Sequence, residues 1–428
     1  MALSFKKHLL AAGLLLVLAL AWIGVRNWDA IAVMVDNAAA LNEGGEAAAD
    51  IRSPDDLVAY LAEHPETVSL AVYDVGRRGE GLFLRADTPR AVPSLPKLQV
   101  AAEYHRRVHA GETDPEEPVA IDSVGVFSLP GITADGHRRA LDTLAARGQV
   151  APDSTVARRH WVDAALNLGD AAALDWILTA WGRETVRALP ARAGLTGSDP
   201  PLPVTGRYLA WTESTATAAA EAAAPGIRGT GADGRAAPPP GAAADAFSAD
   251  AFFADAFRWA HRLRTDAAFR GRVRDRLRAE GTGLRLRDQA DLASDGFPTA
   301  TARDYASWLA RIAGSRFPPV ERFRADWERP LTADTAQTAF THLASRSGAY
   351  PGLLAVAGYA RRSGDAPPRV AVLLVEDLPL AVLYHLLQTG IHKGLQLQLL
   401  AEAAYADRVR SAFASASSSG VWNRPSVL

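Results

Sequence analysis

The sequence predicts an α+β protein in which strands from both ends of the chain form one antiparallel sheet beside a helical region. Near the N-terminus, Ser69–Gly76 and Gly81–Asp87 have the composition of two strands joined by a short turn rich in glycine and arginine. Near the C-terminus, GLLAVAGYARR from Gly352 and RVAVLLVED from Arg369 form a second hairpin around the turn SGDAPP. Helical patterning dominates the chain between them, so we expect the two ends to meet in one sheet with helices packed beside it.

Helical patterning covers several stretches of residues 115–185 and returns over residues 248–285. In the second region, FRGRVRDRLRAE has a heavily charged face, whose arginines are expected to be solvated rather than to form a binding patch. A further helix begins at TATARDYASWLARIA, with Thr301 as its N-cap.

Charge and cysteine content exclude several classes of function. Lysine and arginine number 46 and aspartate and glutamate 48, which gives a net charge of −2. No nucleic-acid partner is expected, because such proteins need a positive surface to neutralise phosphates. The chain has no cysteine, which rules out disulfides, thiolate zinc sites and cysteine nucleophiles. His105 and His109 are four residues apart, but no H-E-x-x-H surrounds them, so we expect a solvated helix face, no metal and no cofactor.

The N-terminus predicts export. Lys6 and Lys7 precede an apolar run from Leu9 to Val25, LLAAGLLLVLALAWIGV. A membrane-spanning helix needs about 20 apolar residues, with roughly 17 as the lower limit, and this run is at that limit. Small residues before Trp22 would also permit cleavage of a secretory signal peptide. Both interpretations place the rest of the chain outside the cytoplasm, and we favour an uncleaved single-pass inner-membrane anchor with an extracytoplasmic domain in the cell envelope.

Composition also divides the chain into parts. Residues 215–246 form a low-complexity Ala/Pro/Gly segment, which predicts a disordered or mobile insertion. The parts are a signal anchor or signal peptide (1–30), an alanine-rich stalk or linker (31–51), a domain in two pieces (52–214 and 295–415), a low-complexity plus helical insertion (215–294) and a C-terminal tail (416–428).

Ser94 and Lys97 stand three residues apart in RAVPSLPKLQV, where a loop is expected to become a helix. One interpretation is structural: Ser94 caps the helix, and Pro96 fits its first turn because the missing amide proton needs no partner there. The other is chemical, since residues three apart share one helix face and Lys97 could be the base for a Ser94 nucleophile. Taken alone, this S-x-x-K pattern favours the cap, because serine often starts helices.

The sequence RSGA, Arg346–Ala349, is expected at the front of the strand that continues as GLLAVAGY. A small residue such as Gly348 on an edge strand lets a substrate backbone approach, as recognition by strand addition requires. The structural alternative is that Arg346 is an ordinary edge-strand charge that discourages aggregation.

The order of these motifs resembles that of the penicillin-recognising serine hydrolases, especially class A β-lactamases and related DD-peptidases. Those enzymes carry S-x-x-K, then S-D-N, then K-[TS]-G on the sheet edge that faces the nucleophile. Here Ser94–Lys97, Asp170 within GDAAALDWIL, and Arg346–Gly348 follow in the same order. The resemblance covers roughly residues 52–214 and 295–415 and implies the β-lactamase/transpeptidase-like fold.

The resemblance implies acyl transfer through a covalent ester on Ser94, with a neutral Lys97 as the base. The unperturbed pKa of lysine is near 10.4, so burial or a nearby cation would have to lower it. The backbone amides of Ser94 and Ala349 would form the oxyanion hole. Arg346 and Ser347 would hold a substrate carboxylate, with an arginine in place of the usual lysine. The substrate would be a β-lactam, peptide or ester of the cell envelope.

The second motif departs from the family pattern. Gly169 stands where its serine belongs and Ala171 where its asparagine belongs, so only Asp170 matches. Loss of these two polar groups should slow acylation, on the order of 10²-fold for each. Asp170 itself can be structural and tie down the turn.

A deacylating glutamate is also hard to find. The region where the Ω-loop of the family should lie reads GLTGSDPPLPVTGRYLAWTES, and its only acids are Asp199 and Glu213. Without a base to activate water, an acyl-enzyme would persist. Two interpretations therefore stay open: a serine hydrolase, and a catalytically degenerate protein of the same fold that binds an envelope partner.

Overall fold

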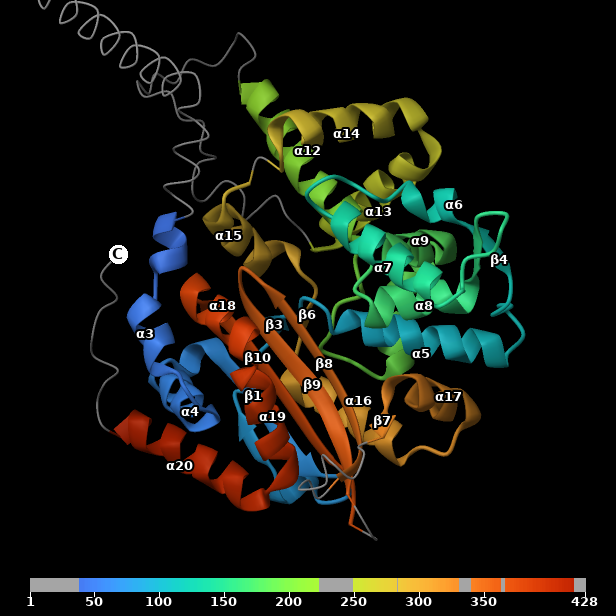
Figure 1. The fold of residues 1–428 in the computed structure, drawn as a ribbon. Coiled ribbons are helices and arrows are strands. Elements are labelled where there is room, and N and C mark those ends of the chain that lie inside the picture. The colour runs from blue at the N-terminus through green and yellow to red at the C-terminus, as the bar shows by residue number, and fades with distance from the viewer. Residues whose placement is uncertain (1–37, 223–248, 283, 331–339, 363–365, 419–428) are drawn as a thin grey trace, which may run out of the picture.

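The computed structural model describes residues 38–222, 249–282, 284–330, 340–362 and 366–418 (Figure 1). It confirms the α+β class, because one antiparallel sheet lies beside a region built of helices.

Two sequence-based expectations fall largely outside these residues. They are the apolar helix within residues 1–30 and the greater part of the low-complexity segment, residues 223–248. Residues 215–222, which were expected in that segment, continue helix α12 (Val204–Ala222). Among the helices that the structure describes, none combines the length and apolar character needed to cross a bilayer.

The sheet has six strands in the spatial order β2-β1-β10-β9-β8-β7, and every neighbouring pair is antiparallel. β1 joins the C-terminal strands by pairing Val68 with Val375 and Asp74 with Arg369. The expected meeting of the two chain ends in one sheet is therefore confirmed. The strands are β1 (Val68–Asp74), β2 (Leu82–Leu84), β7 (Arg329–Pro330), β8 (Phe340–Tyr350), β9 (Gly352–Arg362) and β10 (Arg369–Leu378).

Helices cover both faces of the sheet (Figure 1). The strands β1, β9 and β10 are accordingly continuous apolar runs with almost every residue buried, rather than alternating ones. One face packs against α3 (Gly45–Asp50), α4 (Pro54–Glu63), α18 (Leu380–Thr389), α19 (Ile391–Ala401) and α20 (Ala403–Ser418). The other packs against α5 (Pro96–His109), α16 (Ala302–Gly314) and α17 (Pro318–Trp327).

The segment expected to be a stalk is partly built into this layer. Ala48 and Ile51 are 7% and 2% exposed and belong to the core between the sheet and the terminal helices. Local capping places other elements as expected: the Thr301 hydroxyl accepts a hydrogen bond from the backbone N–H of Asp304 at 3.1 Å and so starts α16.

The helical region has its own apolar core around the fully buried Trp161. It contains α6 (Ile121–Gly125), α7 (Ala134–Ala146), α8 (Arg158–Asn167), α9 (Ala171–Trp181), α10 (Arg183–Arg187) and α11 (Leu189–Ala193), with the short strand pair β4 (Pro118–Ala120) and β5 (Thr155–Ala157).

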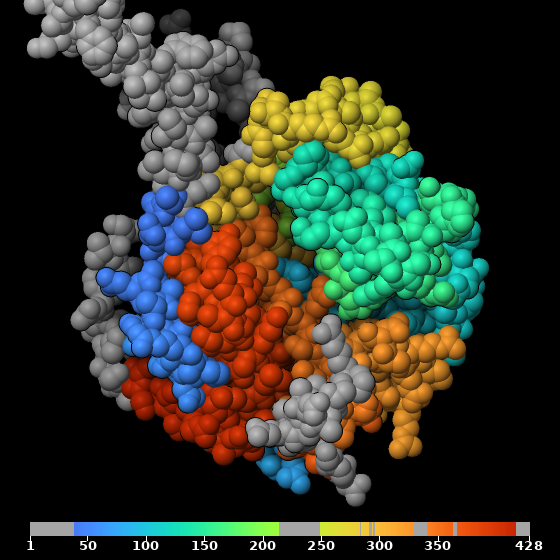
Figure 2. Space-filling view, viewed as in Figure 1, coloured from blue at the N-terminus to red at the C-terminus, as the bar shows by residue number. Residues whose placement is uncertain are grey.

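Helices from the expected insertion extend this region, and Figure 2 shows residues 249–282 lying directly on it. They are α13 (Ala249–Thr265) and α14 (Ala267–Glu280), which pack with α12, whereas α15 (Leu286–Gly296) packs against strand β9 of the sheet. Phe253, Phe257 and Phe269 enter the same apolar core as Trp161. The helical part of the insertion is therefore an integral layer of the fold.

Candidate active site

Ser94 lies between the short strand β3 (Arg90–Ala91) and helix α5. The N-cap residue of α5 is Leu95, and no side chain forms a capping hydrogen bond there. The capping interpretation of Ser94 is therefore wrong, because the chain enters the helix one residue later. The Ser94 hydroxyl is left free of that structural task.

The strand before Ser94 is fixed by a buried arginine. Arg90 donates to a carboxylate oxygen of Glu376 at 2.9 Å and to the Ser69 hydroxyl at 2.7 Å, and it is only 4% exposed. The other carboxylate oxygen of Glu376 accepts the backbone N–H of Ala91 at 2.7 Å. Such charge-assisted hydrogen bonds tie β3 to the central strands β1 and β10 and hold the entry to α5 in place.

Gly348 of β8 lies directly against Ser94. A β-carbon at position 348 would stand 2.6 Å from the Ser94 Cβ and 2.7 Å from the Ser94 backbone nitrogen. These distances are far below van der Waals contact, so β8 reaches Ser94 only because residue 348 has no side chain. β7 pairs only with His342 and Leu343, so among the described strands the edge of β8 beside Ser94 has no partner.

The position of RSGA within the sheet differs from the expectation. Arg346–Ala349 lie at the end of β8, and a hairpin at residues 350–352 separates them from GLLAVAGY, which is β9. The reason is the Pro351-Gly352 turn, in which the φ of +79° at Gly352 makes the tight reversal. The motif still reaches the nucleophile, because β8 and not β9 runs beside α5.

Lys97 follows Ser94 by one turn of α5, and its backbone N–H donates to the Ser94 carbonyl at 3.3 Å. The pKa of Lys97 is lowered to about 7, first by burial and then by repulsion from the Arg346 guanidinium, while Asp170 and Asp175 oppose the shift. Lys97 is then partly neutral near pH 7. Although the residue as a whole keeps some solvent contact, its ammonium group lies among these buried charges.

The Ser94 hydroxyl and the Lys97 amine do not form a hydrogen bond with each other in the described structure. Catalytic hydrogen bonds are often long in a ligand-free site and tighten when substrate binds.

Arg346 points back into the protein, where it donates to the backbone carbonyl of Leu166 at the end of α8. Alternation along β8 places Arg346 and Gly348 on the face toward α5, and Ser347 and Ala349 on the opposite face. Ala349 packs into the core beneath the terminal helices. A carboxylate site shared by Arg346 and Ser347 stays a prediction, as does the oxyanion role of the Ser94 and Ala349 amides.

Asp170 has a structural role. It is 0% exposed and begins α9 by accepting the backbone N–H groups of Ala172 and Ala173 at 2.9 and 3.1 Å. Its second oxygen lies 2.8 Å from Nδ1 of the buried His137. The preceding Gly169 has φ of +74°, and a β-carbon there would meet no atom within 4 Å. The serine that the resemblance places at position 169 would have had space there, but the positive φ of the backbone favours glycine.

The two acids of the Ω-loop region are both engaged elsewhere. One oxygen of Asp199 accepts the backbone N–H and the hydroxyl of Thr299 at 2.9 and 2.7 Å, which fastens the chain to β6 (Thr299–Ala300). Glu213 forms an ion pair with Arg276 at 2.8 Å. Both carboxylates are thus committed to partners other than Ser94, so neither is a ready base for deacylation.

Asp175 is a member of the site region that the sequence reasoning missed. It is 0% exposed, and it accepts the backbone N–H groups of Val204 and Thr205 at 2.6 and 2.7 Å and the Thr205 hydroxyl at 2.6 Å. Burial raises its pKa to about 6, although these hydrogen bonds oppose the shift. An acid within the apolar helical run ALDWIL was the available signal, since a carboxylate in such a run has to find buried partners.

The two histidines of α5 differ from the expected solvated face. His109 is exposed, but His105 is buried, with its Nε2 atom 3.1 Å from a carboxylate oxygen of Asp326 on α17. The reason is that α17 packs along α5 and covers one of its faces. Within the described residues, no cluster of three or more His, Asp or Glu side chains could hold a metal ion.

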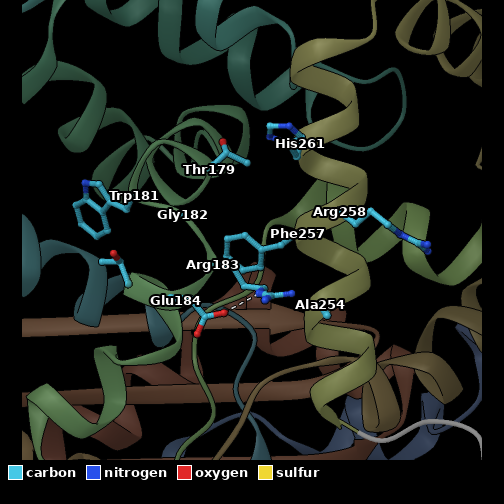
Figure 3. A pocket seen from close by; sticks show the side chains of 10 residues that line it. Thr179, Trp181, Gly182, Arg183, Glu184, Ala254, Phe257, Arg258 and His261 are labelled. Atoms are coloured by element: carbon cyan, nitrogen blue, oxygen red, sulfur yellow. Dashed lines mark hydrogen bonds and ion pairs between the residues drawn. The ribbon is translucent and has the colours of Figure 1, made fainter.

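A separate hollow of about 540 Å³ lies between α10 and α13 (Figure 3). Trp181 and Phe257 line it together with polar groups, among them the Arg183–Glu184 pair at 2.8 Å. None of its lining residues comes from α5 or β8, so it is distinct from the Ser94 region.

No protein-family model and no curated protein matches the sequence. Solved structures that this chain resembles include a β-lactamase from Sphaerobacter thermophilus, at 14% identity and a TM-score of 0.44, covering 86% of this chain and 98% of that one. Another is PBP-A, at 13% identity and a TM-score of 0.44, covering 84% of this chain and 96% of that one.

A β-lactamase from Xanthomonas campestris pv. campestris is similar at 12% identity and a TM-score of 0.43, covering 82% of this chain and 97% of that one. The structural likeness is thus to β-lactamases and PBP-A. Because these identities and TM-scores are low, the function proposed below rests on the side chains of this chain itself.

Proposed function

We propose that this chain is an extracytoplasmic serine hydrolase of the β-lactamase-like kind, which acylates Ser94 with a β-lactam, peptide or ester of the cell envelope. The observation that carries the proposal is the contact of Ser94 with Gly348, with Lys97 one turn away on the same helix. Acyl transfer needs a nucleophile, a base and a place for the substrate. Ser94 has no capping role, Lys97 has a lowered pKa, and the edge of β8 is free of a described strand.

In the proposed reaction, neutral Lys97 accepts the Ser94 hydroxyl proton as Oγ attacks the substrate carbonyl carbon. The carbonyl oxygen becomes an anion, which the backbone amides of Ser94 and Ala349 receive. The tetrahedral species then expels the amine or alcohol, which takes up a proton, and the acyl group remains on Oγ. Gly169 offers no hydroxyl to relay that proton, so the leaving group depends on the lysine or on water.

Turnover is expected to stop at the acyl-enzyme. Asp199 and Glu213 are engaged with Thr299 and Arg276, and both oxygens of Asp175 accept hydrogen bonds from α12. No carboxylate among the described residues is thus poised to activate a water molecule against the ester.

The alternative is a degenerate protein of this fold that binds an envelope partner. Two observations favour it: Arg346 is turned onto the Leu166 carbonyl, and Ser94 and Lys97 do not form a hydrogen bond in the ligand-free chain. In either case, the paired lysines and apolar run within residues 1–30 support a membrane anchor with the domain outside the cytoplasm.

Intact mass spectrometry of the full chain in mild detergent, incubated with benzylpenicillin, tests the proposal. We expect a stable adduct of the penicillin mass on the parent and none on Ser94→Ala. If the parent stays unmodified by penicillin and by a reactive acyl ester as well, the acyl-transfer proposal is wrong and the binding alternative takes its place.

A further inference from the structure

Arg207, near the start of helix α12, has a guanidinium group that no described residue holds by a hydrogen bond or an ion pair. Tyr350 and Asp175 act on its charge through space, but neither accepts a hydrogen bond from it, and both oxygens of Asp175 already accept hydrogen bonds from Val204 and Thr205. Burial lowers the pKa of Arg207 to about 10, so it stays cationic at neutral pH.

Two aromatic rings hold this guanidinium. Its central carbon lies 3.5 Å from the ring centroid of Phe297 and 5.7 Å from that of Tyr350, and the two rings are 4.6 Å apart. Stacking occupies the flat face of a guanidinium and leaves the N–H groups around its edge available. A planar fork of free donors is the geometry that receives a carboxylate through two parallel hydrogen bonds.

The two rings also locate Arg207 relative to Ser94. Tyr350 is two residues beyond Gly348 on β8, which corresponds to roughly 7 Å of strand from the contact with Ser94. Phe297 precedes Pro298, whose carbonyl accepts the backbone N–H of Val92 at 2.9 Å, two residues before Ser94. The chain segments that carry Phe297 and Tyr350 therefore both contact the segment around Ser94.

Arg207 and Arg346 are associated with opposite ends of the RSGA segment. Arg346 lies before Gly348 and is bonded to the Leu166 carbonyl, whereas Arg207 lies beside Tyr350, after Gly348. A substrate extended along β8 would meet these two cations on opposite sides of its reacting carbonyl. Arg207 is half-buried and its guanidinium makes no hydrogen bond with the described residues, so a ligand carboxylate could take up its free donors.

We propose that Arg207, stacked on Phe297 and Tyr350, binds a carboxylate in the acyl portion of the substrate, on the side of Ser94 opposite to Arg346. This inference rests on the proposed function, because it assigns the substrate class of the same site: acyl donors with an acidic group on the carbonyl side. It makes α12 a source of specificity as well as an extension of the helical core.

The test compares benzylpenicillin with its α-carboxy derivative, which differs by one carboxylate on the acyl side. Acylation rates of the full chain in mild detergent are followed by intact mass spectrometry. We expect the parent to prefer the α-carboxy probe by about tenfold or more, Arg207→Gln to lose this preference, and Arg207→Lys to retain part of it. Arg272→Gln, at an exposed position of α14, is the matched control and should keep the parent's preference.

Non-covalent binding of both probes to Ser94→Ala, with and without Arg207→Gln, separates this inference from the proposed function. If neither probe acylates the parent but Ser94→Ala still binds the α-carboxy probe more tightly through Arg207, the anion site stands and the acyl-transfer proposal falls. If acylation occurs without a preference, or if Arg207→Gln keeps the preference with an unchanged circular dichroism spectrum, the anion site is overturned. Failure of Ser94→Ala to bind the α-carboxy probe, together with no acylation, overturns both.

Discussion

Gly348 and Ser94 are in direct contact, so closely that a β-carbon on residue 348 would stand 2.6 Å from that of Ser94. The contact joins the end of β8 to the start of α5. Because Ser94 sits on a strand–helix junction held by Arg90 and Glu376, it cannot retreat easily from an added methyl group.

Gly348→Ala should therefore displace β8 from Ser94. We expect at least about a hundredfold loss in the rate of acylation by a reactive penicillin, because misplacement by about 1 Å costs that much in an oriented reaction. Gly271→Ala, in the middle of α14 with open space around it, is the control and should be neutral or slightly stabilising. Equal acylation by Gly348→Ala and the parent would show that the contact does not matter for the chemistry.

The pH dependence of acylation should report Lys97. A base has to be neutral, and the pKa of Lys97 is about 7, so the rate should rise about tenfold per pH unit below pH 7 and level off above it. Arg346→Gln removes a nearby positive charge, which raises the pKa of Lys97 and should move the midpoint of the profile to higher pH. Lys97→Met should abolish the inflection. A parent profile that is flat between pH 5 and 9 would exclude Lys97 as the base.

Asp170 should matter for folding more than for chemistry. Asp170→Ala leaves the first N–H groups of α9 and the buried His137 without their partner, and we expect a loss of about 2–4 kcal/mol in the free energy of unfolding, measured by urea denaturation. Asp170→Asn keeps a capping oxygen and should lose less. Asp135→Ala removes an exposed ion pair with Arg138 and should cost less than about 0.5 kcal/mol. Equal losses at positions 170 and 135 would contradict the capping role.

The acyl adduct should be long-lived. With Asp199 bound to Thr299 and Glu213 paired with Arg276, neither acid can serve as the base for hydrolysis. We expect the penicillin adduct to persist for hours after free penicillin is removed, as followed by mass spectrometry. Asp199→Asn and Glu213→Gln should leave its lifetime unchanged, and a variant whose adduct lasted tenfold longer would identify the base that this structure does not reveal.

Most of the framework was predictable because it depends on local patterns. The hairpins, the cap of α16 by Thr301 and the order of S-x-x-K before RSGA could all be recognised in short windows of sequence. Local patterns gave wrong predictions where the same short sequence is compatible with two structures. Ser94 matched a helix cap, but the helix begins after Leu95. RSGA and GLLAVAGY were expected in one strand, although Pro351-Gly352 between them forms a hairpin turn.

Other residues could not be assigned without the fold. His105 was expected to be solvated because its neighbours in sequence are arginines, and it is buried by α17, which follows it by more than 200 residues. Asp175 and Arg207 could not be assigned to the site from the sequence. Asp175 is one acid in an apolar helix and Arg207 one of many arginines, and only the fold shows which groups surround them.

The sequence by itself determined the fold class, the strand and helix segments and the candidate pair Ser94 and Lys97, because backbone propensity and apolar periodicity act between near neighbours in the chain. Only the tertiary structure decided whether that pair could be chemically useful. The approach of Gly348 to Ser94 and the lowered pKa of Lys97 beside Arg346 both join segments about 250 residues apart. Burial and Coulomb interactions act through space, so they follow the packing of β8 against α5 and not the order of residues in the sequence.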